Sequence, residues 1–211
     1  MAIRIALAGN PNCGKTTMFN ALTGANQYVG NWPGVTVEKK EGKLKSKKVK
    51  EEVVVTDLPG IYSLSPYTLE EVVSRDYLLK ENPDVIVDLV DATNIERNLY
   101  LTTQLIETGV PVVIALNMAD LLEKRGIKID VVRLSMLLDC PIVETSALKG
   151  EGLDKLIDEA IKTAKKKEAD LPKEIFNKDL EDAVSAAAEV LPSSIDANKK
   201  RWYAVKFLEK D

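Results

Sequence analysis

The most informative absence in the chain is histidine, which does not occur at all. Any mechanism that requires an imidazole as a base or as a metal ligand is therefore excluded. Only two cysteines occur, Cys13 and Cys140, and their unrelated contexts argue against a disulfide framework or a zinc site and favour a reducing compartment. The longest clean apolar stretch, residues 110–116, is far shorter than the roughly 20 residues that a membrane-spanning helix needs.

The sequence also lacks an excess of basic residues. It has 29 Lys and Arg against 33 Asp and Glu, which gives a net charge of -4. A nucleic-acid-binding or anionic-membrane-binding surface needs a basic excess, so no nucleic-acid partner is expected. The first nine residues form a strand-like run without the pattern of a secretory signal.

Hydrophobic residues make up 45% of the 211 residues, enough for one medium-sized domain with at most a small appendage. Short apolar runs predict buried strands at residues 3–8, 53–56, 85–90, 112–116 and 142–145. Amphipathic segments predict helices between them, at residues 15–23, 68–80, 95–108, 131–138 and 153–166. This alternation indicates an α/β fold with a mostly parallel sheet.

One region near the N-terminus breaks the alternation. Residues 36–44 and 49–56 are joined by the lysine-rich segment 45–48, which leaves no room for a helix. The two segments should form a hairpin, so the sheet should contain one antiparallel pair. The preceding segment, residues 24–33, has no periodicity and is expected to be a loop.

The character of the chain changes after residue 167. Residues 168–173 are polar, carry Pro172 and predict a linker, whereas residues 179–191 and 196–210 predict two helices, with Asp196 as a helix cap. We therefore expect one domain over residues 1–167 and a small helical domain, which need not be complete, over residues 168–211. Two apolar stripes should be buried against the larger domain, namely Leu180, Val184, Ala187, Val190 and Leu191, and Trp202, Val205 and Leu208.

The segment between the first strand and the first helix matches the P-loop pattern in full. Its residues are Gly9, Asn10, Pro11, Asn12, Cys13, Gly14, Lys15 and Thr16, followed by Thr17. Glycines let backbone N–H groups approach phosphates, and a helix N-terminus adds positive potential. Lys15 should neutralise the β- and γ-phosphates, and the Thr16 hydroxyl should bind Mg²⁺. The alternative is a glycine-rich turn without a ligand.

Two further elements complete the predicted metal and γ-phosphate site. Asp57 ends a strand and is followed by Leu58, Pro59 and Gly60. Its carboxylate should hold Mg²⁺ through water, and the Gly60 N–H should reach the γ-phosphate. Thr36, in the sequence Gly34, Val35, Thr36, should bind the metal only when a γ-phosphate is present, which would make its loop a switch.

The base site is predicted from residues that follow the next two strands. Asp120, in the sequence Asn117, Met118, Ala119, Asp120, can accept hydrogen bonds from guanine N1–H and the 2-amino group. Adenine lacks this donor pair, so such a site discriminates strongly. Backbone N–H groups of Ser146, Ala147 and Leu148 should reach guanine O6. Met118 stands where this motif usually has lysine, and its side chain can cover the base in the same way at a modest cost in affinity.

In this order, the motifs predict a Ras-like P-loop nucleotide hydrolase. The expected fold is a mixed six-stranded sheet flanked by helices, followed by the small helical domain. The expected activity is binding of magnesium–GTP and its hydrolysis to GDP.

Longer stretches of the chain resemble the N-terminal GTPase domain of the ferrous iron transport protein B family. They are residues 9–16 with Asn-Pro-Asn, residues 30–38 around Trp32, residues 57–64 with Ile-Tyr-Ser-Leu, residues 117–120 with methionine, and the tail near residues 200–202. The resemblance implies a domain at the cytoplasmic face of the cell membrane that precedes a ferrous iron permease in the same polypeptide. It also implies that the tail is the start of a helical domain that slows GDP release, by holding the base-binding loops near Ser146 closed.

The resemblance extends to catalysis. In resembling GTPases the second asparagine of Asn-Pro-Asn binds K⁺, which here implicates Asn12, so K⁺ is expected to stimulate a slow turnover. The residues expected to act in catalysis are Lys15, Thr36, Gly60 and Asn12.

Two other interpretations stay open at this point. One is a stand-alone GTPase of the ribosome-assembly type, which shares Asn-Pro-Asn but normally carries an RNA-binding module. The other is a GTP-gated switch with negligible turnover, because Ile61 stands where Ras-like enzymes use a glutamine to orient the attacking water. The oligomeric state, including a homo-oligomer, also stays open.

Overall fold

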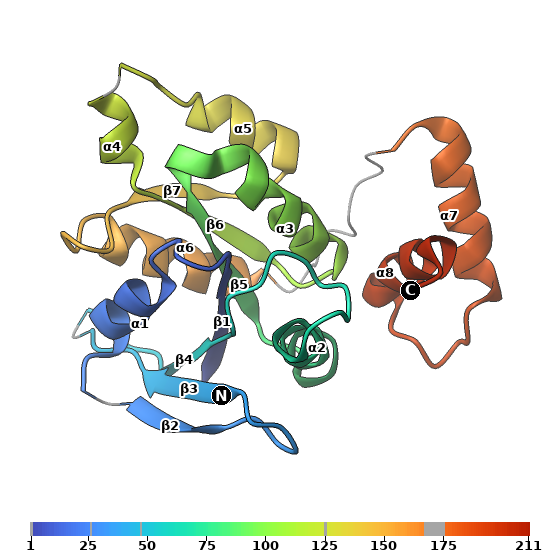
Figure 1. Cartoon of the computed structure of the whole chain (residues 1–211), viewed down its shortest axis with the longest axis horizontal. Helices are drawn as coiled ribbons and strands as arrows, with labels where there is room; N and C mark the ends of the chain where they lie inside the picture. Colours follow the sequence, from blue (N-terminus) through green and yellow to red (C-terminus); the bar gives the residue numbers. More distant parts are fainter. Residues whose placement is uncertain (1, 26, 47, 125, 167–175) are drawn as a thin grey trace.

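The computed structural model describes residues 2–211 except 26, 47, 125 and 167–175, and it contains one sheet with helices on both faces (Figure 1). The seven strands lie in the order β2-β3-β4-β1-β5-β6-β7. The predicted linker at residues 168–173, with Pro172, lies outside the described residues.

The five strands predicted from apolar runs are confirmed. They are β1 (Ile3–Gly9), β4 (Val53–Asp57), β5 (Val85–Asp91), β6 (Val112–Asn117) and β7 (Ile142–Thr145), and each is parallel to its neighbour in this group. Every residue of β6 is buried, as expected for a strand covered on both faces.

The N-terminal side of the sheet is antiparallel. The predicted hairpin is confirmed as β3 (Glu38–Lys43) paired with β4. The structure has one strand more than the predicted six, because β2 (Gln27–Asn31) pairs antiparallel with β3 inside the segment expected to be a loop. This pairing follows from the open edge that β3 offers, since β2 itself is short and carries no alternating pattern.

The two faces of the sheet are covered by different helices. Apolar side chains of α1 (Lys15–Thr23) and α6 (Leu153–Lys165) form one core layer with alternate residues of the central strands. The other layer holds side chains from α2 (Leu69–Asp76), its continuation η1 (Tyr77–Glu81), α3 (Ile95–Glu107) and α5 (Val131–Leu138). The short elements η2 (Ala92–Asn94) and α4 (Ala119–Glu123) were not predicted.

The tail forms α7 (Lys178–Val190) and α8 (Ala197–Glu209). The two helices pack through a small cluster of Val184, Ala187 and Ala204. Trp202 of α8 is only 2% exposed and belongs to the core layer of the α2 and α3 side of the sheet. The predicted burial of the stripes is therefore only partly right, since Leu180, Val190 and Leu208 are exposed.

Polar contacts hold α8 against the same side of the sheet. Arg201 bonds Glu107 of α3 at 2.8 Å and Glu181 of α7 at 2.6 Å. The Lys199 ammonium donates to the carbonyl of Leu79 at 2.7 Å. Asp196 is the N-cap residue of α8 as predicted, but its side chain makes no capping hydrogen bond and lies 3.6 Å from Lys199 instead.

The tail docks on α3 and η1, and its expected role in holding the base-binding loops closed stays a prediction. Figure 1 shows α8 and the loop that follows β7 on opposite sides of the molecule. Because α8 docks on α3 and η1, any influence of the tail on the loop near Ser146 has to pass through the sheet and its helices.

Candidate functional site

The P-loop connects the end of β1 to the start of α1. Gly14 precedes the helix with φ +96°, and Asn12 also has a positive φ, +67°. A Cβ on Gly9 would lie 2.7 Å from the carbonyl oxygen of Leu89, so only glycine fits there. Asn12, Thr16 and Thr17 are exposed at this turn, whereas Asn10 and Cys13 are buried. Burial raises the pKa of the Cys13 thiol to about 12, which leaves it protonated and unreactive.

Lys15 and Asp57 meet at the ends of two neighbouring strands. The register of β1 with β4 sets Leu7 beside Asp57, and the Lys15 ammonium lies 2.6 Å from the carboxylate. Burial raises the pKa of Asp57, and the charge and hydrogen bond of Lys15 oppose this rise. Thr16 directly follows Lys15, and its hydroxyl and the Asp57 carboxylate are oxygen donors of the kind that Mg²⁺ prefers, so these residues fit the metal.

The segment after Asp57 lies against the P-loop. Ile61 N–H donates to the Gly9 carbonyl at 3.3 Å, and a Cβ on Gly60 would lie 3.2 Å from the Cα of Pro11. Leu58 and Ile61 are 1% and 3% exposed, and both point into the core. Pro59 is half-buried between them. The Ile61 side chain therefore cannot orient a water molecule, and Gly60 presents only its backbone.

Among the described residues, no hydrogen bond joins Thr36 to Lys15 or Asp57. It is exposed, in a turn between β2 and β3 that also holds Gly34, with φ +77°, and the half-buried Val35. The turn is closed by the hydrogen bond from Trp32 N–H to the Val37 carbonyl at 2.9 Å. The Trp32 ring is buried edge-to-face against Tyr77, with ring centroids 5.3 Å apart.

Asn117 joins the phosphate side to the base side. Its side-chain amide donates to the Cys13 carbonyl at 2.9 Å and accepts from the Ala147 N–H at 3.0 Å. Asn117 is 2% exposed, so these bonds are shielded from water. Ser146 and Ala147 are buried beside it, and Leu148 is fully exposed at the tip of the loop.

Asp120 and Met118 lie at the start of α4. Met118 is the N-cap residue, with φ +64°, and its methyl group approaches Gly14 of the P-loop. Asp120 accepts a hydrogen bond from the ammonium of Lys149 at 2.6 Å. This bond lowers the pKa of Asp120, so the carboxylate stays ionised.

The family follows from comparison with known proteins. The sequence pattern of the family described as "Ferrous iron transport protein B" matches residues 3–160. The chain belongs to this family. It is 43% identical over 99% of its length to the Fe(2+) transporter FeoB of Shigella flexneri, and 48% identical over 99% to a Fe(2+) transport protein A/FeoB fusion protein of Porphyromonas gingivalis.

The chain spans about a quarter of these FeoB relatives, 27% and 25% of their lengths. In the described part of the chain, no helix is both long and apolar enough to cross a bilayer. The same residues contain no group of three or more Cys, Asp or Glu side chains placed to hold a metal ion.

Solved FeoB structures have the same P-loop GTPase fold. A mutant NFeoB of S. thermophilus bound to mGDP is 54% identical, with a TM-score of 0.94 over all of this chain and 80% of its own. Another bound to GMPPNP is 53% identical, with a TM-score of 0.87 over 99% of this chain and 80% of its own. A third, bound to GDP.AlF4-, has a TM-score of 0.84 at 52% identity, over 99% of this chain and 80% of its own.

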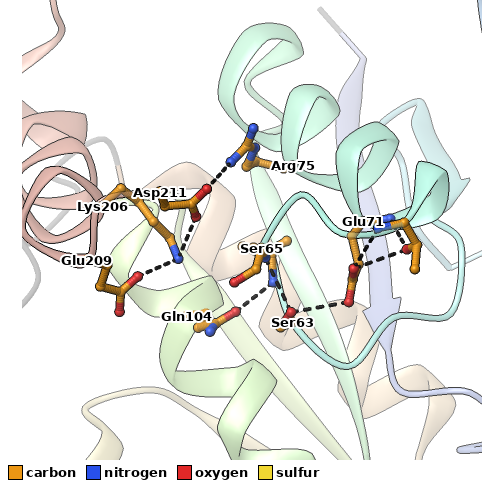
Figure 2. A network of polar contacts seen from close by, with 10 residues as sticks. Ser63, Ser65, Glu71, Arg75, Gln104, Lys206, Glu209 and Asp211 are labelled. Atoms are coloured by element: carbon orange, nitrogen blue, oxygen red, sulfur yellow. Dashed lines mark hydrogen bonds and ion pairs between the residues drawn. The ribbon is translucent and has the colours of Figure 1, made fainter.

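In this chain the segment after Gly60 is fixed by side chains that sequence reasoning missed (Figure 2). Glu71 caps α2 together with Thr68 and also accepts from the Ser63 hydroxyl at 3.2 Å. Gln104 of α3 accepts from the Leu64 N–H at 2.6 Å. The capping box Thr-x-x-Glu before an apolar helix was a visible signal for Glu71, whereas Gln104 gave none.

Proposed function

We propose that this chain binds magnesium–GTP and hydrolyses it to GDP and phosphate. The observation that carries the proposal is the double hydrogen bond of Asn117, since it makes the phosphate loop and the base loop parts of one site. Further support comes from the similar NFeoB structures, whose bound molecules are mGDP, GMPPNP and GDP.AlF4-.

Each residue near the phosphates has a distinct task in this proposal. Lys15 neutralises the β- and γ-phosphates, and the backbone of residues 9–14 donates to their oxygens. Thr16 and Asp57 hold Mg²⁺, which when bound supplies positive charge to the phosphate oxygens. Gly60 N–H reaches the γ-phosphate, and Thr36 would bind Mg²⁺ only when that phosphate is present, so both are sensitive to whether GTP or GDP is bound.

Hydrolysis is proposed to depend on K⁺ held by Asn12. The buried Ile61 leaves this region without the glutamine of Ras-like enzymes, so charge in the transition state needs another source. Asn12 is exposed on the P-loop with its backbone in the left-handed region. Phosphate release should be faster in K⁺ than in Na⁺, and Asn12→Ala should remove the difference. Equal wild-type rates in the two salts would contradict this role.

The cellular role that we propose is control of ferrous iron uptake through a membrane permease in the same polypeptide. The names of the FeoB relatives and the short span of the chain within them support this proposal. The chain would then act at the cytoplasmic face of the membrane. We also propose that residues 168–211 belong to a helical domain that slows GDP release, with residues 1–167 as the nucleotide-binding domain.

The decisive test of guanine binding is Asp120→Asn. Without the carboxylate, GDP affinity should fall strongly, while xanthosine diphosphate, whose 2-oxo group suits an amide donor, should gain affinity. Titration with fluorescent GDP and xanthosine diphosphate analogues measures both. Undiminished GDP affinity in the variant would overturn the assignment.

A second candidate function, a GTP-gated switch with negligible turnover, is favoured by the burial of Ile61. Turnover measured in K⁺ separates the two functions. Phosphate release no faster than GTP decay without protein would favour the switch.

A further inference from the structure

An ion pair connects the two loops of the base site. Asp120 lies in the first turn of α4, and Lys149 lies in the loop after β7, 29 residues further along the chain. The ammonium of Lys149 lies 2.6 Å from the Asp120 carboxylate, and the side chains are 48% and 27% exposed. The pair is therefore at the rim of the site, not beneath it.

We propose that Lys149 is a positioning residue for guanine: it orients the Asp120 carboxylate and ties the loop of residues 146–149 to α4. This inference rests on the proposed function, because it assigns Asp120 to the base. In this arrangement the Asp120 carboxylate and the loop both hold the base, and GDP leaves when the Lys149–Asp120 ion pair breaks.

The acceptor capacity of Asp120 allows Lys149 to stay while a base is bound. An ionised carboxylate offers about four acceptor positions, of which guanine N1–H and the 2-amino group use two. Lys149 takes a position on Oδ2. Because its hydrogen bond lowers the pKa of Asp120, the form that accepts from both guanine donors is maintained.

The cation at this carboxylate has to come from outside the base motif. The second position of the motif is Met118, whose methyl group packs toward Gly14 and carries no charge. Lys124 acts on Asp120 through its charge, whereas Lys149 also donates a hydrogen bond to its carboxylate. A separate loop thus supplies the cation.

Backbone hydrogen bonds close the loop, so the ion pair at Lys149 can act on the backbone that is proposed to bind the base. Ser146 and Glu151 exchange hydrogen bonds of 3.1 Å in both directions, and Lys149 N–H donates to the Ser146 carbonyl at 3.2 Å. Movement of Lys149 therefore moves Ser146 and Ala147. The hydrogen bond from Ala147 N–H to the Asn117 side chain is a second connection between this loop and the base motif, and it would remain when Lys149 is replaced.

The experiment compares Lys149→Met with Lys155→Met by stopped-flow release of a fluorescent GDP analogue. Lys155 is an exposed lysine at the start of α6, so its replacement makes the same change in net charge. Lys149→Met should release GDP roughly three- to fivefold faster, the range expected for a partly exposed ion pair. Lys155→Met should match the wild type, and Lys149→Arg should restore most of the slow release.

A double-variant measurement separates positioning from a general effect on the loop. In the Asp120→Asn background, Lys149 has no carboxylate to orient, so adding Lys149→Met should leave xanthosine diphosphate release unchanged. The acceleration in the single variant should also shrink as salt is raised, because salt screens exposed ion pairs.

Three results would overturn the inference while the proposed function stands. They are equal GDP release from Lys149→Met and Lys155→Met, equal acceleration with and without the Asp120 carboxylate, and acceleration that salt does not change. A wild-type chain that binds no GDP would overturn the proposed function itself.

Discussion

Replacing Gly109 by alanine should loosen α8 from the rest of the chain. Gly109 follows α3 with φ +75°, directly beneath the first turn of α8. An added Cβ would lie 3.0 Å from the carbonyl carbon of Asn198 and closer still to its oxygen. Both atoms belong to backbone, so no side-chain rotation can relieve the overlap.

The size of the effect follows from two contributions. Alanine at a positive φ costs about 1 kcal/mol wherever it occurs. Relieving the overlap requires α8 to move by roughly 1 Å, because the carbonyl oxygen of Asn198 is the closer atom and has to reach ordinary contact distance. Trp202 and the Lys199 and Arg201 bonds resist this movement, and overpacking of this kind costs about 1–3 kcal/mol. The total expected loss of unfolding free energy is about 2–4 kcal/mol.

Gly126→Ala is the matched control. Gly126 has φ +71° and no atom within 4 Å of an added Cβ, so only the first contribution applies. Urea unfolding measures both variants, and Trp202 fluorescence in a Trp32→Phe background reports whether α8 has left its site. Equal stability losses in the two variants, with unchanged Trp202 emission, would refute the reasoning. If the variant does undock α8, its GDP release rate tests the proposed role of the tail.

Three further predictions concern separate parts of the chain. Arg201→Met removes the guanidinium that bonds Glu107 and Glu181 and should cost about 3 kcal/mol or more in urea unfolding; a loss below about 1 kcal/mol would contradict this. Burial raises the pKa of Asp88 to about 7, so the folded chain holds a proton there that the unfolded chain has lost above about pH 4. This contribution makes stability fall by about 1.4 kcal/mol per pH unit between about pH 4 and 7, and Asp88→Asn should remove it. Parallel stability curves of wild type and variant against pH would contradict this. Thr36→Ala should leave GDP affinity nearly unchanged and weaken GTP binding or hydrolysis; loss of GDP binding would make Thr36 a structural residue.

The strands of the parallel part were predictable because two layers of helices cover them. Burial on both faces requires continuous apolar runs such as that of β6, and such runs can be recognised in sequence. The strand β2 was not predictable. Its five residues include Gly30 and polar ends, and its position depends on β3, with which it pairs. Pairing with an open edge depends on residues elsewhere in the chain.

The tail shows a similar limit. An apolar stripe indicates that a helix is buried, but it does not say which part of the stripe meets a neighbour. The helices α7 and α8 approach through the small side chains of Ala187 and Ala204, so the larger Val190 and Leu208 are left at the surface. Lys199 and Lys206 are buried in place of apolar residues because their polar ends reach a carbonyl and carboxylates.

The motifs of the candidate site were predictable because each is contiguous in sequence. The bonds between motifs were not. Asn117 reaches Cys13 across 104 residues, and Lys149 reaches Asp120 across 29. Neither contact has a sequence spacing that would reveal it, since both depend on how loops from different strands meet at one edge of the sheet.

The two hydrogen bonds of Asn117 have a consequence for the length of the ligand. One buried amide sets the separation between the phosphate loop at Cys13 and the base loop at Ala147. If the proposed nucleotide site is correct, this fixed separation matches the single sugar between a base and its phosphates. An analogue with a longer or shorter spacer would then reach the phosphate loop or the base loop, but not both at once.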